Sequence, residues 1–191
     1  MIKKTITAAA VTFVALGAVA FAHSGASGIY KERMDAMAAM GKVVKDLSAI
    51  MRGEADYDAA KIQEGARLIQ SHAGEAMTLQ FPEGTTDKPS EARVEIWSDW
   101  DTFSELAEQL KMNAEGLEKA ASNGLAMGGQ TSGSMMGTEN STMMGGQSGM
   151  MSGDQTMMSA EQLAAMPADG VFNAVAQTCS ACHTKFRLEK K

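Results

Sequence analysis

Apolar side chains recur at intervals of three and four residues in four segments of the chain, and this spacing places them on one face of a helix. The four segments span residues 29–51, 59–76, 100–121 and 172–186. No stretch alternates apolar and polar residues for long enough to predict a strand. The pattern therefore predicts an all-α fold.

Glycine and proline separate these helical segments. Gly53 ends the first, and Asp56 or Asp58 then provides an N-cap for the second. Pro82 and Pro89 lie in a longer connection before the third segment, where they prevent a continuous helix. Helices of about 20 residues joined by short turns pack as antiparallel neighbours. We therefore expect an antiparallel up-down-up-down four-helix bundle.

A targeting segment precedes the bundle. Lys3 and Lys4 are followed by an uncharged run over residues 5–22 that ends in Ala-Phe-Ala, the order typical of a secretory signal peptide. The run is shorter and less apolar than the roughly 20 residues that a membrane-spanning helix needs. We expect cleavage after Ala22, a mature chain that begins at His23 and has no membrane span, and a periplasmic location.

Residues 123–159 differ in composition from the rest of the chain, because they consist almost wholly of Gly, Ser, Thr, Gln and Met. We interpret them as a flexible insertion between the first three helices in 23–122 and the fourth helix in 160–191. Methionine pairs recur every seven or eight residues, and thioethers are soft ligands that suit Cu(I). This supports a hypothesis of Cu(I) handling, with a spacer or a sacrificial oxidant sink as the alternatives.

The fourth helical segment carries the motif C-x-x-C-H at Cys179, Cys182 and His183. On a helix these three positions lie on one side, so two thiols and one imidazole reach the same flat ligand. That arrangement is the attachment signature of a covalent haem c. The motif predicts two thioether links and an iron–histidine bond.

Other uses of two cysteines fit this context less well. A thioredoxin-like pair begins a helix that follows a strand, whereas residues upstream of Cys179 already have helical periodicity. A structural disulfide across so short a loop would stabilise the fold little. A zinc site needs more ligands, and His23 and His72 are the remaining histidines of the sequence.

The position of the motif constrains the other side of the iron. Only eight residues follow His183, so a second axial group has to come from an earlier helix. The methionines Met34, Met37 and Met40 of the first helical segment are the candidates. A methionine on such a seam is by default a core residue, because its side chain packs adaptably.

Charge gives weaker information about partners. The formal charge of the chain is −6 at pH 7, and loss of the two lysines of the signal peptide makes it −8. This argues against nucleic-acid binding, which requires a basic face. Lys185, Arg187, Lys190 and Lys191 nevertheless cluster beside the haem motif. They predict either a positive surface that attracts redox partners or a basic helix end favoured by the helix dipole.

Four sequence segments together resemble the class II c-type cytochromes, which comprise cytochrome c′ and its low-spin relatives. They are KERMDAMAAMG in the first helix, QFPEGT after the second, EIWSDWDTF at the start of the third and CSACHTKFR near the C-terminus. The resemblance covers nearly all of the expected mature chain except the insertion. It implies one haem c, attached through Cys179 and Cys182, with His183 as the proximal iron ligand.

The resemblance also implies roles for three further residues. Arg187 would lie against the proximal imidazole, and Arg33 would lie near the haem propionates. The distal position falls on Met37, where members of the family carry either a ligating methionine or a bulky residue that leaves the iron five-coordinate. A homodimer formed through the first two helices is a further expectation from the family.

The identity of the distal residue separates two functions. A methionine bond to iron suits an electron carrier that acts with redox partner proteins, whereas an open distal pocket suits a protein that binds NO or CO. We favour electron transfer because residue 37 is a methionine rather than an aliphatic residue. Enzyme activity is not expected, because no distal acid–base group is evident near Met37.

Overall fold

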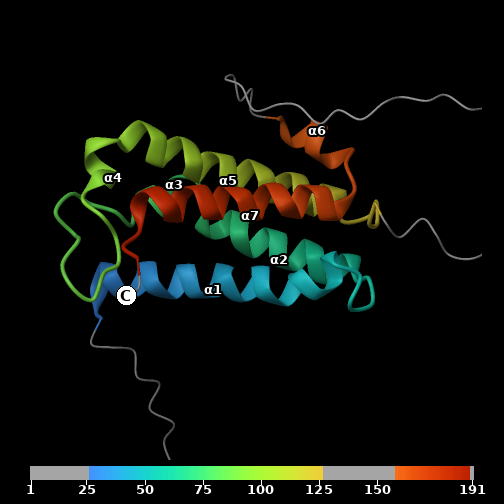
Figure 1. Ribbon diagram of the computed structural model, residues 1–191, viewed down its shortest axis with the longest axis horizontal. Helices are drawn as coiled ribbons and strands as arrows, with labels where there is room; N and C mark the ends of the chain where they lie inside the picture. Colours follow the sequence, from blue (N-terminus) through green and yellow to red (C-terminus); the bar gives the residue numbers. More distant parts are fainter. Residues whose placement is uncertain (1–25, 127–157, 190–191) are drawn as a thin grey trace, which may run out of the picture.

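A computed structural model of the protein describes residues 26–126 and 158–189. These residues form four long helices and three short ones, and within them no strand is present (Figure 1). The helices are α1 (Gly28–Met51), α2 (Ala59–His72), α3 (Glu75–Thr78), α4 (Glu95–Ser98), α5 (Trp100–Ala120), α6 (Ala160–Ala164) and α7 (Ala168–Phe186).

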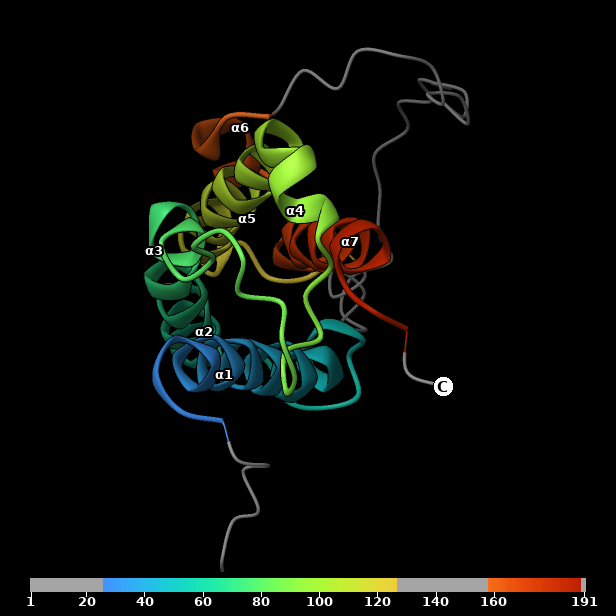
Figure 2. The same cartoon turned by 90° about the vertical axis from the view of Figure 1, so that its left-hand side faces the viewer.

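The long helices α1, α2, α5 and α7 form the antiparallel four-helix bundle that the sequence predicts (Figures 1 and 2). Helix α2 packs against α1 and α5, and α5 packs against α7, whereas α1 and α7 make few direct contacts. The core is built from the apolar stripe of each helix. Its largest fully buried side chains are Leu47, Ile62, Ile69, Ile96, Phe103, Leu117, Leu163, Val171 and Val175.

The second helical segment is shorter than predicted. Helix α2 ends at His72, and Gly74 adopts a positive φ of 61°. The amide of Gly74 donates a hydrogen bond of 2.9 Å to the carbonyl of Ala107 on α5. This break changes the helical register, so that Ala76 is exposed and Met77 of α3 is buried instead. The prediction that Ala76 continues the buried apolar stripe of the second helical segment is therefore wrong.

Local polar contacts fix the other helix ends. Asp58, one of the two predicted caps of α2, accepts a hydrogen bond of 3.0 Å from the amide of Lys61. Ser159 and Gln162 form a reciprocal capping box at the start of α6. The amide group of Asn123 donates to two carbonyls at the end of α6, each at 2.8 Å. The amide of Ala168 also donates a hydrogen bond of 2.9 Å to the carbonyl of Gly124, so residues 123–126 lie beside the end of α6 and the start of α7.

Several sequence expectations fall outside the described residues. They are the signal peptide over 1–22, the start of the mature chain at His23, and the Met-rich core of the predicted insertion together with its Cu(I) hypothesis. None of the helices in the described part of the chain is long and apolar enough to cross a membrane.

We expect Gly116→Ala to destabilise the bundle, because a Cβ at Gly116 would lie 2.4 Å from the Cβ of Leu163 in α6. Overpacking of this kind costs about 1–3 kcal/mol, and urea unfolding followed by circular dichroism will measure the loss. Gly170→Ala is the matched control, because its nearest neighbour is the flexible end of Met166 at 3.3 Å. Equal stability of the two variants would contradict the packing described here.

Candidate functional site

Two adjoining cavities lie between α1 and α7, at the end of the bundle where α7 terminates. The outer cavity has a volume of about 620 Å³ and the inner one about 200 Å³. Their combined size suits a cofactor, since small-molecule sites measure about 300–1,000 Å³. Four residues line both cavities: Met37, Gly41, Cys182 and His183.

Helix α7 supplies the three residues of the haem motif. Val175 and Phe186 are buried and fix the face of α7 that packs on the bundle. Cys179 lines the inner cavity, and Cys182 and His183 line both. The two thiols are free and half-buried, whereas His183 is exposed. The structure thus brings the predicted attachment residues together at one cavity wall.

The environment of these groups disfavours the thioredoxin-like alternative. Burial raises the pKa of the Cys179 thiol. Burial, together with the nearby charge of Cys179, raises the pKa of the Cys182 thiol to about 11. A reactive redox pair requires the opposite shift. Desolvation and the neighbouring Arg187 cation lower the pKa of His183, against an opposing effect of Glu91. The imidazole is therefore neutral at pH 7, as an iron ligand must be.

Helix α1 forms the facing wall. Met34 lines the outer cavity, the buried Met40 lines the inner one, and Met37 lines both. One turn after Met37, Gly41 has no atom within 4 Å of the position that a Cβ would occupy. A glycine in a helix interior costs about 0.5–1 kcal/mol relative to alanine. Its presence here leaves open space on the α1 wall, as a flat macrocycle requires.

Aromatic side chains close one end of the outer cavity. The ring centroids of Phe81 and Phe103 lie 4.9 Å apart, and those of Phe103 and Phe186 lie 5.5 Å apart. All three side chains are buried and all three line the cavity. The indole of Trp97 donates a hydrogen bond of 3.0 Å to the carbonyl of Phe81. This cluster provides a dry, rigid wall for an apolar ring.

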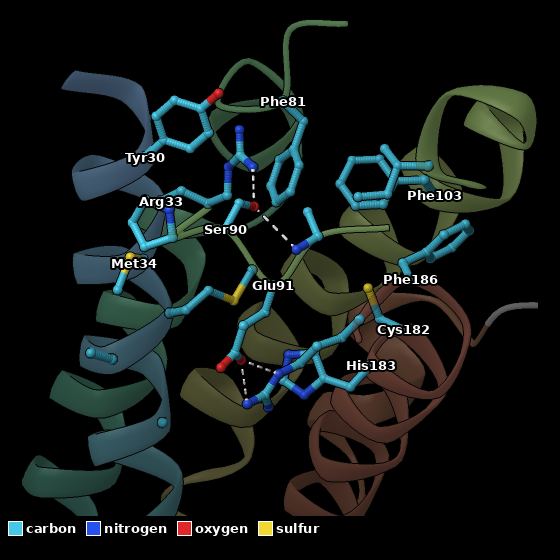
Figure 3. A pocket seen from close by; sticks show the side chains of 17 residues that line it. Tyr30, Arg33, Met34, Phe81, Ser90, Glu91, Phe103, Cys182, His183 and Phe186 are labelled. Carbon is cyan, nitrogen blue, oxygen red and sulfur yellow. Dashed lines mark hydrogen bonds and ion pairs between the residues drawn. The ribbon is translucent and has the colours of Figure 1, made fainter. Parts of the chain in front are cut away.

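Arg33 lies at the α1 edge of the outer cavity and is only 5% exposed (Figure 3). Its guanidinium donates five hydrogen bonds of 2.8–3.1 Å to neutral oxygens, which belong to Gln80, Thr85 and Ser90. Its Cζ also lies 4.0 Å from the ring centroid of Phe81. Burial lowers the pKa of Arg33, but an arginine remains charged. Arg33 lines the cavity as the resemblance led us to expect, and its role near the haem propionates stays a prediction; the hydrogen bonds to Gln80, Thr85 and Ser90 could not be foreseen from the sequence.

Arg187 lines the same cavity from the α7 side, one turn after His183. It pairs with Glu91, with Nε and Nη2 at 2.8 and 2.7 Å from one carboxylate oxygen. Sequence reasoning missed Glu91, since nothing distinguishes it from other loop acids. Lys185 similarly pairs with Asp99. The positive surface predicted beside the motif is therefore offset by carboxylates among the described residues, and Lys190 and Lys191 lie outside them.

The donor set and the shape of the cavities fit a covalent haem. Two thiols and one imidazole share a wall of α7, a thioether lies on α1, and apolar side chains surround the space between them.

A family model described as Cytochrome C' matches residues 29–138. This chain belongs to the cytochrome c′ family. The family binds one covalent haem c, and the two cysteines near the C-terminus fit its attachment motif. The matched region ends before the C-x-x-C-H motif. The cavities provide separate evidence that the motif belongs to the same site, because Cys182 and His183 line them together with Met37 of the matched region.

Individual relatives agree with this assignment. Cytochrome c-556 of Agrobacterium fabrum (strain C58 / ATCC 33970) is 32% identical over 114 residues, which make up 60% of this chain and 74% of the relative. Cytochrome c′ from Rhodopseudomonas palustris has a similar fold, with a TM-score of 0.58 and 18% identity over 87% of this chain and 100% of its own. A nitric oxide complex of a cytochrome c prime variant from Alcaligenes xylosoxidans has a TM-score of 0.56 and 22% identity, covering 85% and 94%.

Alkylation of the haem-free cytochrome c′ chain tests the thiol environment. Because the pKa of Cys182 is raised to about 11, the folded chain holds less thiolate than the unfolded chain at any pH below about 11, and the ratio is largest below about pH 9. We expect iodoacetamide to modify Cys182 about a hundredfold more slowly in the folded chain than in urea. The difference should vanish as the pH rises through the folded value. Equal or faster modification of a demonstrably helical chain would indicate a reactive pair instead.

Proposed function

We propose that this cytochrome c′ family member is a periplasmic electron carrier in which His183 and Met37 are the two axial ligands of the haem iron. One observation carries the proposal: among the methionines of the described residues, Met37 alone lines both cavities, as His183 does from the opposite wall. Met34 and Met40 each line only one of them. The chain thus presents a thioether and an imidazole to the same space.

Bound haem supplies one-electron iron chemistry, and methionine–histidine ligation raises its reduction potential. The neutral imidazole of His183 would bind the iron without a proton to displace. The aromatic wall of Phe81, Phe103 and Phe186 keeps water from one side of the cavity, which limits solvent rearrangement. The buried Arg33 cation disfavours additional positive charge nearby, so it too favours the reduced state.

The expected location and partners rest on the sequence. The N-terminal segment predicts export to the periplasm, where redox proteins are the expected partners. The residues that flank Met37 on the cavity wall, Met34, Ala38 and Gly41, carry no acid–base group. We therefore do not propose peroxidase-type catalysis.

A second function has support from one structural feature and one comparison. Open space beside Gly41 could admit a small diatomic ligand if Met37 packs as an apolar plug instead of bonding to iron. Solved structures of similar fold include nitric oxide complexes of cytochrome c prime. In this alternative the iron is five-coordinate, and the protein binds NO or CO.

The absorption and electron paramagnetic resonance spectra of Met37→Leu decide between the two functions. We expect wild-type ferric protein to be almost entirely low-spin and Met37→Leu almost entirely high-spin, because leucine keeps the volume and removes the sulfur. The reduction potential should also fall in the variant.

Met34→Leu is the matched control, since it makes the same substitution one turn earlier on the outer cavity. It should leave the spin state unchanged. A wild-type protein that is already high-spin and takes up CO readily would overturn the proposed Met37 ligation and favour the gas-binding alternative.

A further inference from the structure

A non-helical segment crosses the mouth of the outer cavity between α1 and α7. We call residues 80–93, which connect α3 to α4, the strap. In Figures 1 and 2 this segment extends from the α3–α4 side of the bundle toward the start of α1 and returns. Figure 3 shows Ser90 and Glu91 of the strap between Arg33 on α1 and His183 on α7.

The strap is attached to α1 through Arg33. The five hydrogen bonds of this guanidinium end on Gln80, Thr85 and Ser90. Because Arg33 is buried, any strap position that withdrew these oxygens would leave a cation unsolvated. An unpaired buried charge is strongly unfavourable, so the strap and this turn of α1 move together.

The strap is attached to α7 through Glu91 and its neighbours. The Glu91 carboxylate pairs with Arg187, and the Glu91 carbonyl accepts a hydrogen bond of 2.8 Å from the amide of Leu188. The amide of Arg93 donates a hydrogen bond of 3.0 Å to the carbonyl of Phe186. These contacts form a short antiparallel pairing around Ala92 and Arg187, which fixes the strap to the last turn of α7.

The two attachment points lie one helical turn from the two axial positions. Arg33 precedes Met37 by four residues, and Arg187 follows His183 by four. Arg33 and Met37 are therefore neighbours on one face of α1. Arg187 lies just after the end of α7, in extended conformation, and its amide donates a hydrogen bond of 3.1 Å to the carbonyl of His183. A shift of either arginine therefore affects the position of its axial residue. Ser90 and Glu91, which contact the two arginines, are consecutive in the chain. The strap is therefore a short protein link between the distal and proximal sides.

We propose that the strap sets the spacing of α1 and α7 across the haem and that Ser90 and Glu91 are positioning residues that hold Met37 within bonding reach of the iron. The inference rests on the proposed function, in which Met37 is the distal ligand. Direct contacts between α1 and α7 are few, so the bundle core alone constrains their separation weakly. A metal–ligand bond tolerates little change in distance, which makes this spacing decisive.

Stopped-flow CO binding to the ferrous holoprotein tests the proposal, because CO must wait for Met37 to leave the iron. The double variant Ser90→Ala with Glu91→Gln removes one acceptor from Arg33 and the ionic pair of Arg187. We expect the rate at saturating CO to rise about three- to tenfold. The ferric spectrum should gain a high-spin fraction, and the single variant Glu91→Gln should show a smaller change in the same direction.

Glu95→Gln is the matched control. It makes the same charge change as Glu91→Gln and breaks the side-chain ion pair of Glu95 with Arg93, which lies at the strap–α4 junction; the hydrogen bond from the Arg93 amide to Phe186 does not depend on that pair. It should leave the CO rate unchanged. In a Met37→Leu background the strap variants should also have no effect on the rate, because no methionine then has to dissociate.

The outcomes separate the two proposals. If the strap variants bind CO faster than the wild type, but only when Met37 is present, the result supports the strap as a positioning device. Unchanged rates in folded strap variants of a low-spin wild type would overturn the strap inference and leave Met37 ligation intact. Equal acceleration in the Met37→Leu background would overturn it as well, since the strap would then act on another step. A wild-type haem that is already five-coordinate contradicts both proposals.

Discussion

The separation of α1 from α7 is the constraint on which this structure depends. Packing of α1 on α2, α2 on α5 and α5 on α7 completes the apolar core without bringing the outer pair together. The remaining space is lined by the haem-attachment residues on one side and by Met37 and Gly41 on the other. A haem held by Cys179, Cys182 and His183 would occupy the space between α1 and α7, where direct helix–helix contacts are few, and its binding would then add to the stability of the bundle.

A buried positive charge accompanies this space. Moving an ion out of water costs several kcal/mol even after relaxation, and Arg33 offsets this through five hydrogen bonds to neutral oxygens and through its contact with the Phe81 ring. On the α7 side, Arg187 is neutralised by Glu91. Among the described residues Arg33 forms no ion pair, so the two sides of the cavity differ in charge, and this cation lies on the side of Met37, where it favours electron-rich states of a bound group.

Helical periodicity was sufficient to predict the bundle, and the C-x-x-C-H spacing was sufficient to expect Cys179, Cys182 and His183 on one cavity wall, because both depend on local sequence. The resemblance added Arg33, Arg187 and Met37, which all line the cavity. Glu91 and Ser90 could not be predicted, since their roles arise where a loop meets two helices that are distant in sequence. Gly41 could have been noticed in the sequence, because a glycine in a helix interior one turn after Met37 is unfavourable for the helix and indicates a need for space. The break at Gly74 depends on a tertiary hydrogen bond to Ala107, which periodicity does not encode.

The central claim is that α1 and α7 supply a thioether and an imidazole to one haem iron. Iron K-edge X-ray absorption of the ferric holoprotein tests it most directly, because sulfur and nitrogen neighbours scatter differently and the thioether links of Cys179 and Cys182 are not bonded to iron. The account predicts one sulfur atom in the first coordination shell of the wild-type protein. A first shell of nitrogen alone would contradict it and would make Met37 a packing residue over an open iron.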